Sequence, residues 1–210
     1  MAKILWFDTE TTGIAPACDI VQVAGLIEID GDVKETFNFY TQPFDYGVIE
    51  PDSWAIHGIS LERMQGFPLP AAVHFDLINL FSKYIDKYDS TDKFYPAGYN
   101  VRFDLDFLAS FFKANGDAYF GSWQNWRALD PLYLLYTLDS IGAIHLPNYR
   151  LETVAAHYGI DLTAHDALSD VKAARQIYPH VCRDFVSAFK SHSFPPLLPL
   201  SLNFSCGAAH

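Results

Sequence analysis

Short apolar runs rich in β-branched residues, separated by turn signals, make up the N-terminal part of the chain. They cover residues 5–13, 19–30 and 33–41, and Asp30-Gly31 between the last two is a tight-turn signal. Runs joined in this way are typical of neighbouring antiparallel strands. We therefore predict three antiparallel strands at the start of the fold.

Helical spacing of apolar residues is the main pattern in the rest of the chain. Residues 42–70 hold four prolines and several glycines, so we expect a loop with short helical turns there. Helices are predicted at 71–88, 101–114, 132–140, 151–158 and 167–189, and short strands at 94–99 and 126–129. The fold class that follows is α/β: a mixed five-stranded sheet, three antiparallel strands and then two parallel ones, flanked by helices.

Length and composition indicate one well-cored domain, which we place at residues 1–190. Residues 191–210 are rich in proline and leucine, and we expect them to form a flexible tail. No apolar run approaches the roughly 20 residues that span a bilayer, and the start lacks the pattern of a secretory signal. The cysteines Cys18, Cys182 and Cys206 lie far apart, which fits a reducing compartment. We expect a cytoplasmic protein without membrane contact.

The net charge of −11 argues against a protein that coats long nucleic acids, because such proteins need clustered Lys and Arg. It does not exclude an enzyme of nucleic acids in which bound metal ions supply positive charge locally.

Two acids stand close together in the first predicted strand. Asp8 and Glu10 project to the same side of an extended chain. Like charges at this spacing raise each other's pKa unless a cation neutralises them, and no Lys or Arg occurs between Lys3 and Lys34. Taken alone, the pair could simply lie in water at a strand end.

Two further acids fall on apolar helix faces. Helical spacing places Asp104 among Phe107, Leu108 and Phe111, whereas Asp106 shares a polar face with Arg102. The same spacing places Asp170 beside Ala173, Ala174 and Ile177. A carboxylate on a core-facing stripe is costly unless it is paired or binds a metal ion. Four converging acids predict a site for Mg²⁺ or Mn²⁺, with two ions about 3.5–4 Å apart to hydrolyse a phosphodiester.

A histidine is available as the base of such a reaction. His165 precedes Asp170 by five residues, ahead of a helix that Asp166 could cap. A loop histidine near an activated water is well placed to accept its proton.

Three motifs resemble those of the DEDDh branch of the DEDD exonuclease superfamily, which includes bacterial proofreading subunits and several ribonucleases. They are Phe7 to Gly13, Asn100-x-x-Phe103-Asp104, and His165-x-x-x-x-Asp170, and the resemblance spans about residues 4–178. It implies a ribonuclease H-like fold and 3′→5′ removal of nucleoside 5′-monophosphates from a free end.

The resemblance also implies a role for each site residue. Asp8, Glu10 and Asp170 would hold the cation that activates water, Asp8 would bridge to the second cation, and Asp104 would complete the set. His165 would be the general base.

Contacts to the terminal nucleotide are implied for a second group of residues: Thr11, Gly13, His57, Ile59, Asn100 and Phe103. Two positions depart from the family pattern, since Gln22 stands where many relatives have an acid and Tyr99 where a histidine is common. We expect these departures to affect specificity more than activity.

DNA, as single-stranded or mispaired 3′ ends, is the substrate that we expect. An exoribonuclease is the alternative, because the four acids and the histidine are indifferent to the sugar. An inactive module that binds a polymerase is the non-enzymatic alternative. Residues 199–204 loosely resemble peptides that dock on sliding clamps, but short motifs of this kind match by chance, and a disordered apolar extension is the better explanation.

Overall fold

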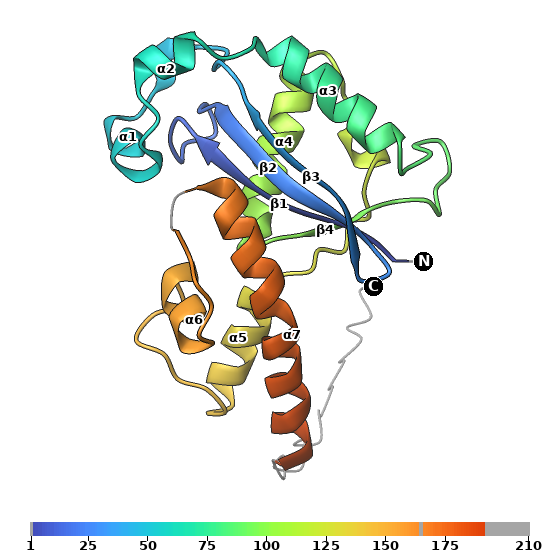
Figure 1. The fold of residues 1–210 in the computed structure, drawn as a ribbon, viewed down its shortest axis with the longest axis vertical. Coiled ribbons are helices and arrows are strands. Elements are labelled where there is room, and N and C mark those ends of the chain that lie inside the picture. Colours follow the sequence, from blue (N-terminus) through green and yellow to red (C-terminus); the bar gives the residue numbers. More distant parts are fainter. Residues whose placement is uncertain (1, 164–165, 192–210) are drawn as a thin grey trace, which may run out of the picture.

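The structure of the chain, a computed structural model, describes residues 2–163 and 166–191 (Figure 1). Its strands are β1 (Lys3–Thr11), β2 (Ile20–Ile29), β3 (Asp32–Tyr40) and β4 (Tyr95–Ala97). Its α-helices are α1 (Pro51–His57), α2 (Leu61–Gln65), α3 (Pro70–Ser82), α4 (Val101–Ala114), α5 (Pro131–Ser140), α6 (Leu151–His157) and α7 (Ala167–Ser191). Two short 3-10 turns are η1 (Tyr46–Val48) and η2 (Phe120–Ser122). The predicted tail lies outside the described residues from position 192 onward.

The strands form one mixed sheet in the order β3-β2-β1-β4. β2 pairs antiparallel with both β1 and β3, and β4 pairs parallel with β1. The predicted α/β class, in which three antiparallel strands are followed by a parallel one, is therefore confirmed.

The prediction of a fifth strand at 126–129 is wrong. Among the described residues, the stretch 124–129 makes only isolated parallel bridges, at Phe94–Gln124 and, within the predicted strand, at Ala97–Leu129. Between the bridges one segment advances from 94 to 97 and the other from 124 to 129, so the longer one bulges outward. Pro96 lacks the N–H that a continuous ladder needs. Trp126, in the bulge, is 86% exposed.

The helix predicted over 71–88 is shorter in the structure, because α3 ends at Ser82. Beyond it, the carbonyl oxygen of Tyr84 accepts a hydrogen bond from Lys3 Nζ at 2.6 Å. The side chain of Ile85 turns into the core, where it is buried. A tertiary contact with β1 thus replaces the helical hydrogen bonds that the apolar spacing favours.

β1 divides the core, because its side chains alternate between two faces of the sheet. Leu5 and Phe7 lie in the large apolar cluster that α3 and α4 complete on one face. Trp6, on the other face, packs against Val171 and Tyr178 of α7, with 5.6 Å between the Trp6 and Tyr178 ring centroids. The sheet therefore lies between α3 and α4 on one side and α7 on the other.

α7 is fastened to the sheet at its N-terminal half. Arg175 Nε donates to Glu28 Oε2 at 2.6 Å, and Trp6 Nε1 donates to the same oxygen at 3.1 Å. The other half of α7 extends beyond the sheet, where α5 and α6 pack beside it (Figure 1). Within the described ranges, none of the helices has the length and apolar character needed to cross a membrane.

The sheet and α4 pack closely at Gly98, which lies directly after β4. A Cβ at this position would lie 2.7 Å from the carbonyl oxygen of Phe7 and 3.1 Å from Val101 Cγ2. Because the first of these atoms belongs to the backbone of β1, the clash requires a shift of β1 or α4. We expect Gly98→Ala to lower the free energy of unfolding, measured by urea titration, by about 1–3 kcal/mol.

Gly121 provides the matched control, because a Cβ there meets no atom within 4 Å. Gly121→Ala should change the free energy of unfolding by less than about 0.5 kcal/mol. Equal stability of the two variants would show that the packing at Gly98 is not tight.

Candidate active site

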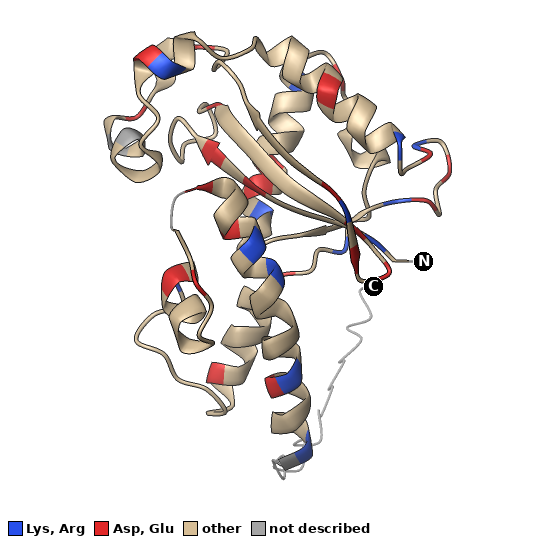
Figure 2. Ribbon diagram, in the orientation of Figure 1, with Lys and Arg blue, Asp and Glu red and all other residues tan. Residues whose placement is uncertain are grey.

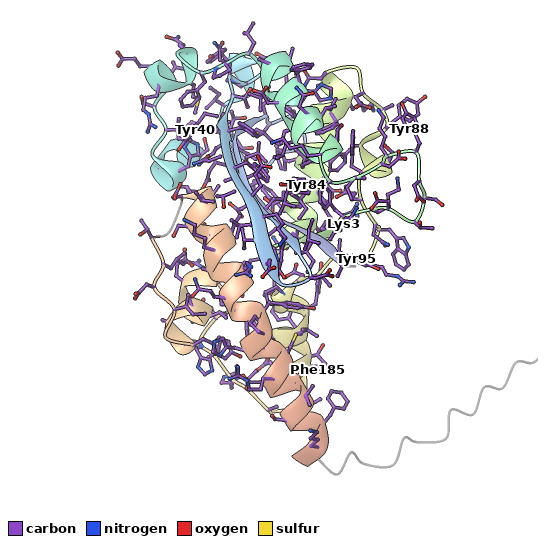
Figure 3. All side chains as sticks on the ribbon, turned by 45° about the vertical axis from the view of Figure 1, so that its right-hand side comes forward. Lys3, Tyr40, Tyr84, Tyr88, Tyr95 and Phe185 are labelled. Atoms are coloured by element: carbon purple, nitrogen blue, oxygen red, sulfur yellow. The ribbon has the colours of Figure 1, made fainter. Side chains whose placement is uncertain are left out.

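The predicted acidic residues gather at one end of the sheet. Glu10 of β1 pairs with Gln22 of β2, which in turn pairs with Tyr40 of β3. Tyr40 marks the end next to α1 and α2, whereas Lys3 and Tyr95 lie at the opposite end (Figure 3). Figure 2 shows acidic segments at the tip of β1 and at the start of α7. The site is therefore built where β1 leaves the sheet.

Three carboxylates meet there. Asp8 and Glu10 project from β1 to the face that Trp6 shares with α7, and Asp170 lies in the first turn of α7. One oxygen from each of the three carboxylates lies within 4.8 Å of the other two. Glu10 is buried, and Asp8 and Asp170 are half-buried. We call these three residues the acidic trio.

The start of α7 is held by Asp166. Its Oδ2 accepts a hydrogen bond from the backbone N–H of Ser169 at 3.3 Å, as expected for a helix cap. Gln22 Nε2 donates to Asp166 Oδ1 at 3.5 Å and to Asn38 Oδ1 at 2.9 Å. Gln22 therefore links the start of α7 to the sheet. His165, the predicted base, lies outside the described residues.

Asp104, in the first turn of α4, reaches β1 from the opposite face. It is 3% exposed, and its Oδ1 accepts hydrogen bonds from Thr9 N at 2.9 Å and Thr9 Oγ1 at 2.7 Å. β4 pairs with β1 only from Ile4 to Trp6. Asp104 therefore binds the N–H of Thr9 at a position of β1 that lies beyond its pairing with β4. Asp104 is thus outside the acidic trio, although its charge raises the pKa of Asp8.

Burial and mutual repulsion change the acidity of these groups. Burial, followed by the charges of Asp104, Asp170 and Glu10, raises the pKa of Asp8 well above its usual value. Burial, followed by the charges of Asp170 and Asp104, raises the pKa of Glu10 to about 7. Burial raises the pKa of Asp104 to about 7, although the bonds from Thr9 favour its ionised form. At neutral pH, the metal-free site therefore resists carrying its full negative charge.

The acidic trio fits a hard divalent cation. Carboxylate oxygens are the ligands that Mg²⁺ and Mn²⁺ prefer in proteins. A cation would also offset the burial and the repulsion that together raise the pKa values of Asp8 and Glu10. The residues that would hold it are Asp8, Glu10 and Asp170.

A pocket of about 300 Å³ opens beside Glu10. Four of the predicted substrate-binding residues line it: Thr11, Gly13, His57 and Phe103. The other lining residues are Thr9, Glu10, Ile14, Glu50, Ser53 and Ile56. The pocket is thus formed by the end of β1, the loop after it, α1 and the start of α4.

The imidazole of His57 is held in one tautomer. Its Nδ1 accepts a hydrogen bond from the backbone N–H of Ile59 at 2.9 Å, so Nε2 carries the proton. Burial lowers the pKa of His57, which keeps the ring neutral. Nε2 is buried and has no hydrogen-bond partner among the described residues. Ile59 itself is buried with Val21 and Met64, so it supports His57 through its backbone and does not line the pocket.

Asp130 is a buried acid that the sequence patterns did not single out. Its carboxylate accepts hydrogen bonds from three backbone N–H groups, those of Asn100 at 3.2 Å, Val101 at 3.0 Å and Leu132 at 2.9 Å. It therefore joins the starts of α4 and α5. Asn100, predicted to shape the pocket, is exposed at the start of α4 and is not among the lining residues. An aspartate before Pro131 was the available signal, since proline favours the first helical position.

One protein-family model and solved structures with a similar fold match this chain. The model of the RNase_T family, described as exonuclease, matches residues 5–178. No match was found among curated proteins.

Solved structures of exonuclease I share the fold. E. coli exonuclease I in complex with a dT13 oligonucleotide has a TM-score of 0.74 and 26% identity, over 90% of this chain and 43% of that one. The zinc-bound E. coli complex with single-stranded DNA has a TM-score of 0.72 and 26% identity, with the same coverage of 90% and 43%. A structure of SSB and exonuclease I with the inhibitor CFAM has a TM-score of 0.71 and 25% identity, over 90% of this chain and 44% of that one. The chain spans less than half the length of these proteins.

The raised pKa values lead to a pH test on the metal-free protein. Acids whose pKa is higher in the folded than in the unfolded chain stabilise the fold at low pH, and this contribution is lost as the pH rises through about 7. Asp8→Asn removes one of the repelling charges. In EDTA at pH 8, we expect this variant to be more stable than the native protein by about 1–3 kcal/mol in urea unfolding.

The difference should shrink as the pH is lowered toward the ordinary pKa of an aspartate, because the folded and the unfolded chain then both take up protons at these acids. Asp106→Asn is the control, since the side chain of Asp106 is 61% exposed and pairs with Arg102 at 2.7 Å, on the polar face predicted for both. Equal stability of the Asp8→Asn variant and the native protein at pH 8 would contradict the repulsion described here.

Proposed function

This chain belongs to the RNase_T exonuclease family, as its motifs predicted, and we propose that it is a metal-dependent 3′→5′ exonuclease that acts on DNA. The observation that carries the proposal is the convergence of Asp8, Glu10 and Asp170 next to a pocket of about 300 Å³. This arrangement suits a phosphodiester at the end of a strand, with the terminal nucleotide in the pocket. The products would be nucleoside 5′-monophosphates.

Two divalent cations, Mg²⁺ or Mn²⁺, would bind. Asp8, Glu10 and Asp170 would hold one, and Asp8 with Asp104 the other. Both bonds from Thr9 end on Oδ1 of Asp104, which leaves Oδ2 for this role. When bound, the cations would lower the pKa of a water molecule and balance the charge on the leaving oxygen.

His165 would accept the proton of the attacking water. Its position in the chain supports this role, because the neighbouring Asp166 caps α7 and lies close enough to raise the pKa of Asp8 and Glu10. The same negative charges would stabilise the imidazolium that forms when His165 takes the proton.

The pocket would bind the terminal nucleotide through one donor and an apolar rim. His57 Nε2–H, which is buried without a partner among the described residues, would donate to an oxygen of this nucleotide after a small movement of the ring into the pocket, because Nδ1 is already used by Ile59. Ile14 and Ile56 are 78% and 51% exposed at the rim, where they would contact the base or sugar. The volume of the pocket lies near the lower bound of roughly 300 Å³ for small-molecule sites, so we expect it to hold one nucleotide.

DNA is favoured by the exonuclease I structures, which contain deoxyoligonucleotides. Because the acids and His165 are indifferent to the sugar, action on RNA is the alternative that the assay must separate. SSB accompanies exonuclease I in one solved structure. For this chain, docking of residues 199–204 on a polymerase or sliding clamp stays a prediction of the sequence, as does a cytoplasmic location.

A side-by-side assay on matched DNA and RNA oligomers labelled at the 5′ end tests the proposal. With Mg²⁺ or Mn²⁺, we expect the DNA to shorten from its 3′ end one nucleotide at a time, and EDTA to abolish the reaction. Faster loss of RNA would favour the exoribonuclease. If both oligomers stayed intact with either metal, the enzyme proposal would fail.

Two aspartates of α4 form a matched pair for the same assay. Asp104→Asn keeps an oxygen for the bonds from Thr9 but removes the charge, and we expect activity to fall at least roughly 10–100-fold. Asp106→Asn, two residues further on an exposed face, should remain close to the native rate. Equal rates for the two variants would remove Asp104 from the metal site.

The role of His165 can be tested by single-turnover kinetics. His165→Ala should lower the rate constant by about 10²–10⁴-fold, because general-base catalysis contributes that much, while the affinity for the oligonucleotide changes little. A rate constant equal to that of the native protein would exclude His165 as the base.

A further inference from the structure

Glu50 lies outside the three sequence motifs but contacts two sides of the pocket. Its carbonyl oxygen accepts hydrogen bonds from Ser53 N at 3.1 Å and Ser53 Oγ at 2.8 Å. These bonds close the first turn of α1, the helix that carries Ile56 and His57 in one wall of the pocket. The backbone of Glu50 is therefore part of that wall.

The side chain of Glu50 binds the loop between β1 and β2, on the other side of the pocket. Oε2 accepts a hydrogen bond from Ile14 N at 3.1 Å, and Oε1 accepts bonds from Ala15 N at 3.2 Å and Cys18 Sγ at 3.4 Å. The backbone N–H of Glu50 donates to the carbonyl oxygen of Thr12 at 2.7 Å. The N–H groups of Ile14 and Ala15 lower the pKa of Glu50, so the carboxylate is ionised where it binds them.

Gly13 shows how closely the carboxylate and the loop approach each other. A Cβ on Gly13 would lie 2.3 Å from Cδ of Glu50, so only glycine leaves room for this contact. Gly13 and the exposed Ile14 are also lining residues of the pocket. The contact with Glu50 is thus made by the same two residues that face the nucleotide site.

The loop also has hydrogen bonds of its own, from Thr11 Oγ1 to the carbonyl oxygen of Gly13 at 2.7 Å and from Cys18 N to the carbonyl oxygen of Ala15 at 2.9 Å, but neither uses the N–H groups of Ile14 and Ala15. Contacts of this kind order a surface loop, whose backbone would otherwise sample many conformations. The base of this loop is closed by Thr12 N, which donates to the carbonyl oxygen of Asp19 at 2.8 Å. Glu50 binds the loop further out, at Ile14 and Ala15. It therefore orders the part of the loop that lines the pocket.

We infer that Glu50 is a positioning residue that sets the width of the pocket by holding the Gly13 and Ile14 wall against the α1 wall. This inference rests on the proposed function, which assigns the pocket to the terminal nucleotide. Glu50 is not a member of the acidic trio. Its effect should appear in nucleotide binding and not in metal binding.

The test compares Glu50→Ala and Glu50→Gln with the native protein. Thymidine 5′-monophosphate is the probe, because a mononucleotide occupies the terminal pocket alone. We expect Glu50→Ala to raise its inhibition constant, and the KM for a single-stranded DNA oligomer, by roughly tenfold or more, with a smaller change in kcat. Glu50→Gln keeps one carbonyl acceptor and the length of the side chain. Its inhibition constant and KM should therefore lie between those of the native protein and those of Glu50→Ala. The affinity for Mn²⁺, measured by calorimetry, should stay unchanged in both variants.

Glu35 offers the matched control. It accepts hydrogen bonds from Lys83 Nζ at 2.8 Å and Tyr84 Oη at 2.9 Å, away from the pocket. Glu35→Ala should leave both the inhibition constant and KM unchanged. Thermal unfolding of each variant checks the fold, and Glu50→Gln carries the test if Glu50→Ala is unstable.

Unchanged nucleotide binding in the Glu50 variants, while the native protein binds the mononucleotide and hydrolyses DNA, would overturn the inference alone. A parallel loss of Mn²⁺ affinity would also overturn it, because it would place the effect in the metal site. If the native protein neither bound the mononucleotide nor hydrolysed the oligomer, the proposed function would fail and the inference with it.

Discussion

Three carboxylates whose oxygens lie within 4.8 Å of one another repel strongly when ionised, so the surrounding structure has to hold them against that force. Asp8 and Glu10 belong to β1, which is paired along most of its length with β2. Asp170 belongs to the first turn of α7, which packs on Trp6 and is tied to β2 by the pair of Arg175 and Glu28. Burial and, after it, the repulsion between the acids raise the pKa values of Asp8 and Glu10. The site is therefore preorganised for a cation.

The fourth acid depends on how the sheet ends. β4 pairs with three residues of β1, and this pairing ends at Trp6 and Ala97. The first turn of α4 lies beside the buried part of β1 that β4 leaves unpaired, where Asp104 binds Thr9. Asp8 and Glu10 project from one face of β1 because side chains alternate along a strand. Thr9 lies between them and binds Asp104, which comes from the other face of the sheet. A short β4 is thus a condition for the full acidic set.

Local periodicity was enough to predict the sheet order of the first three strands and the inward faces of Asp104 and Asp170, because alternation and helical spacing decide which side of an element a residue occupies. The missing fifth strand and the early end of α3 depend on tertiary contacts that no local pattern contains. The contacts of Glu50 could not be predicted for the same reason, because Glu50 lies in an aperiodic loop and its side-chain partners are 32 to 36 residues away in the chain.

The chemistry and the choice of substrate therefore rest on different parts of the fold. Regular elements, β1, α4 and α7, hold the acids, whereas the pocket is walled largely by the loop after β1 and by α1. The two parts share Glu10 and Thr9. In the proposed enzyme, a change in the loop would alter how the terminal nucleotide is held without moving the charges that act on its phosphate. Since the acids of the proposed site would not distinguish DNA from RNA, we expect the walls of the pocket to discriminate between the two sugars.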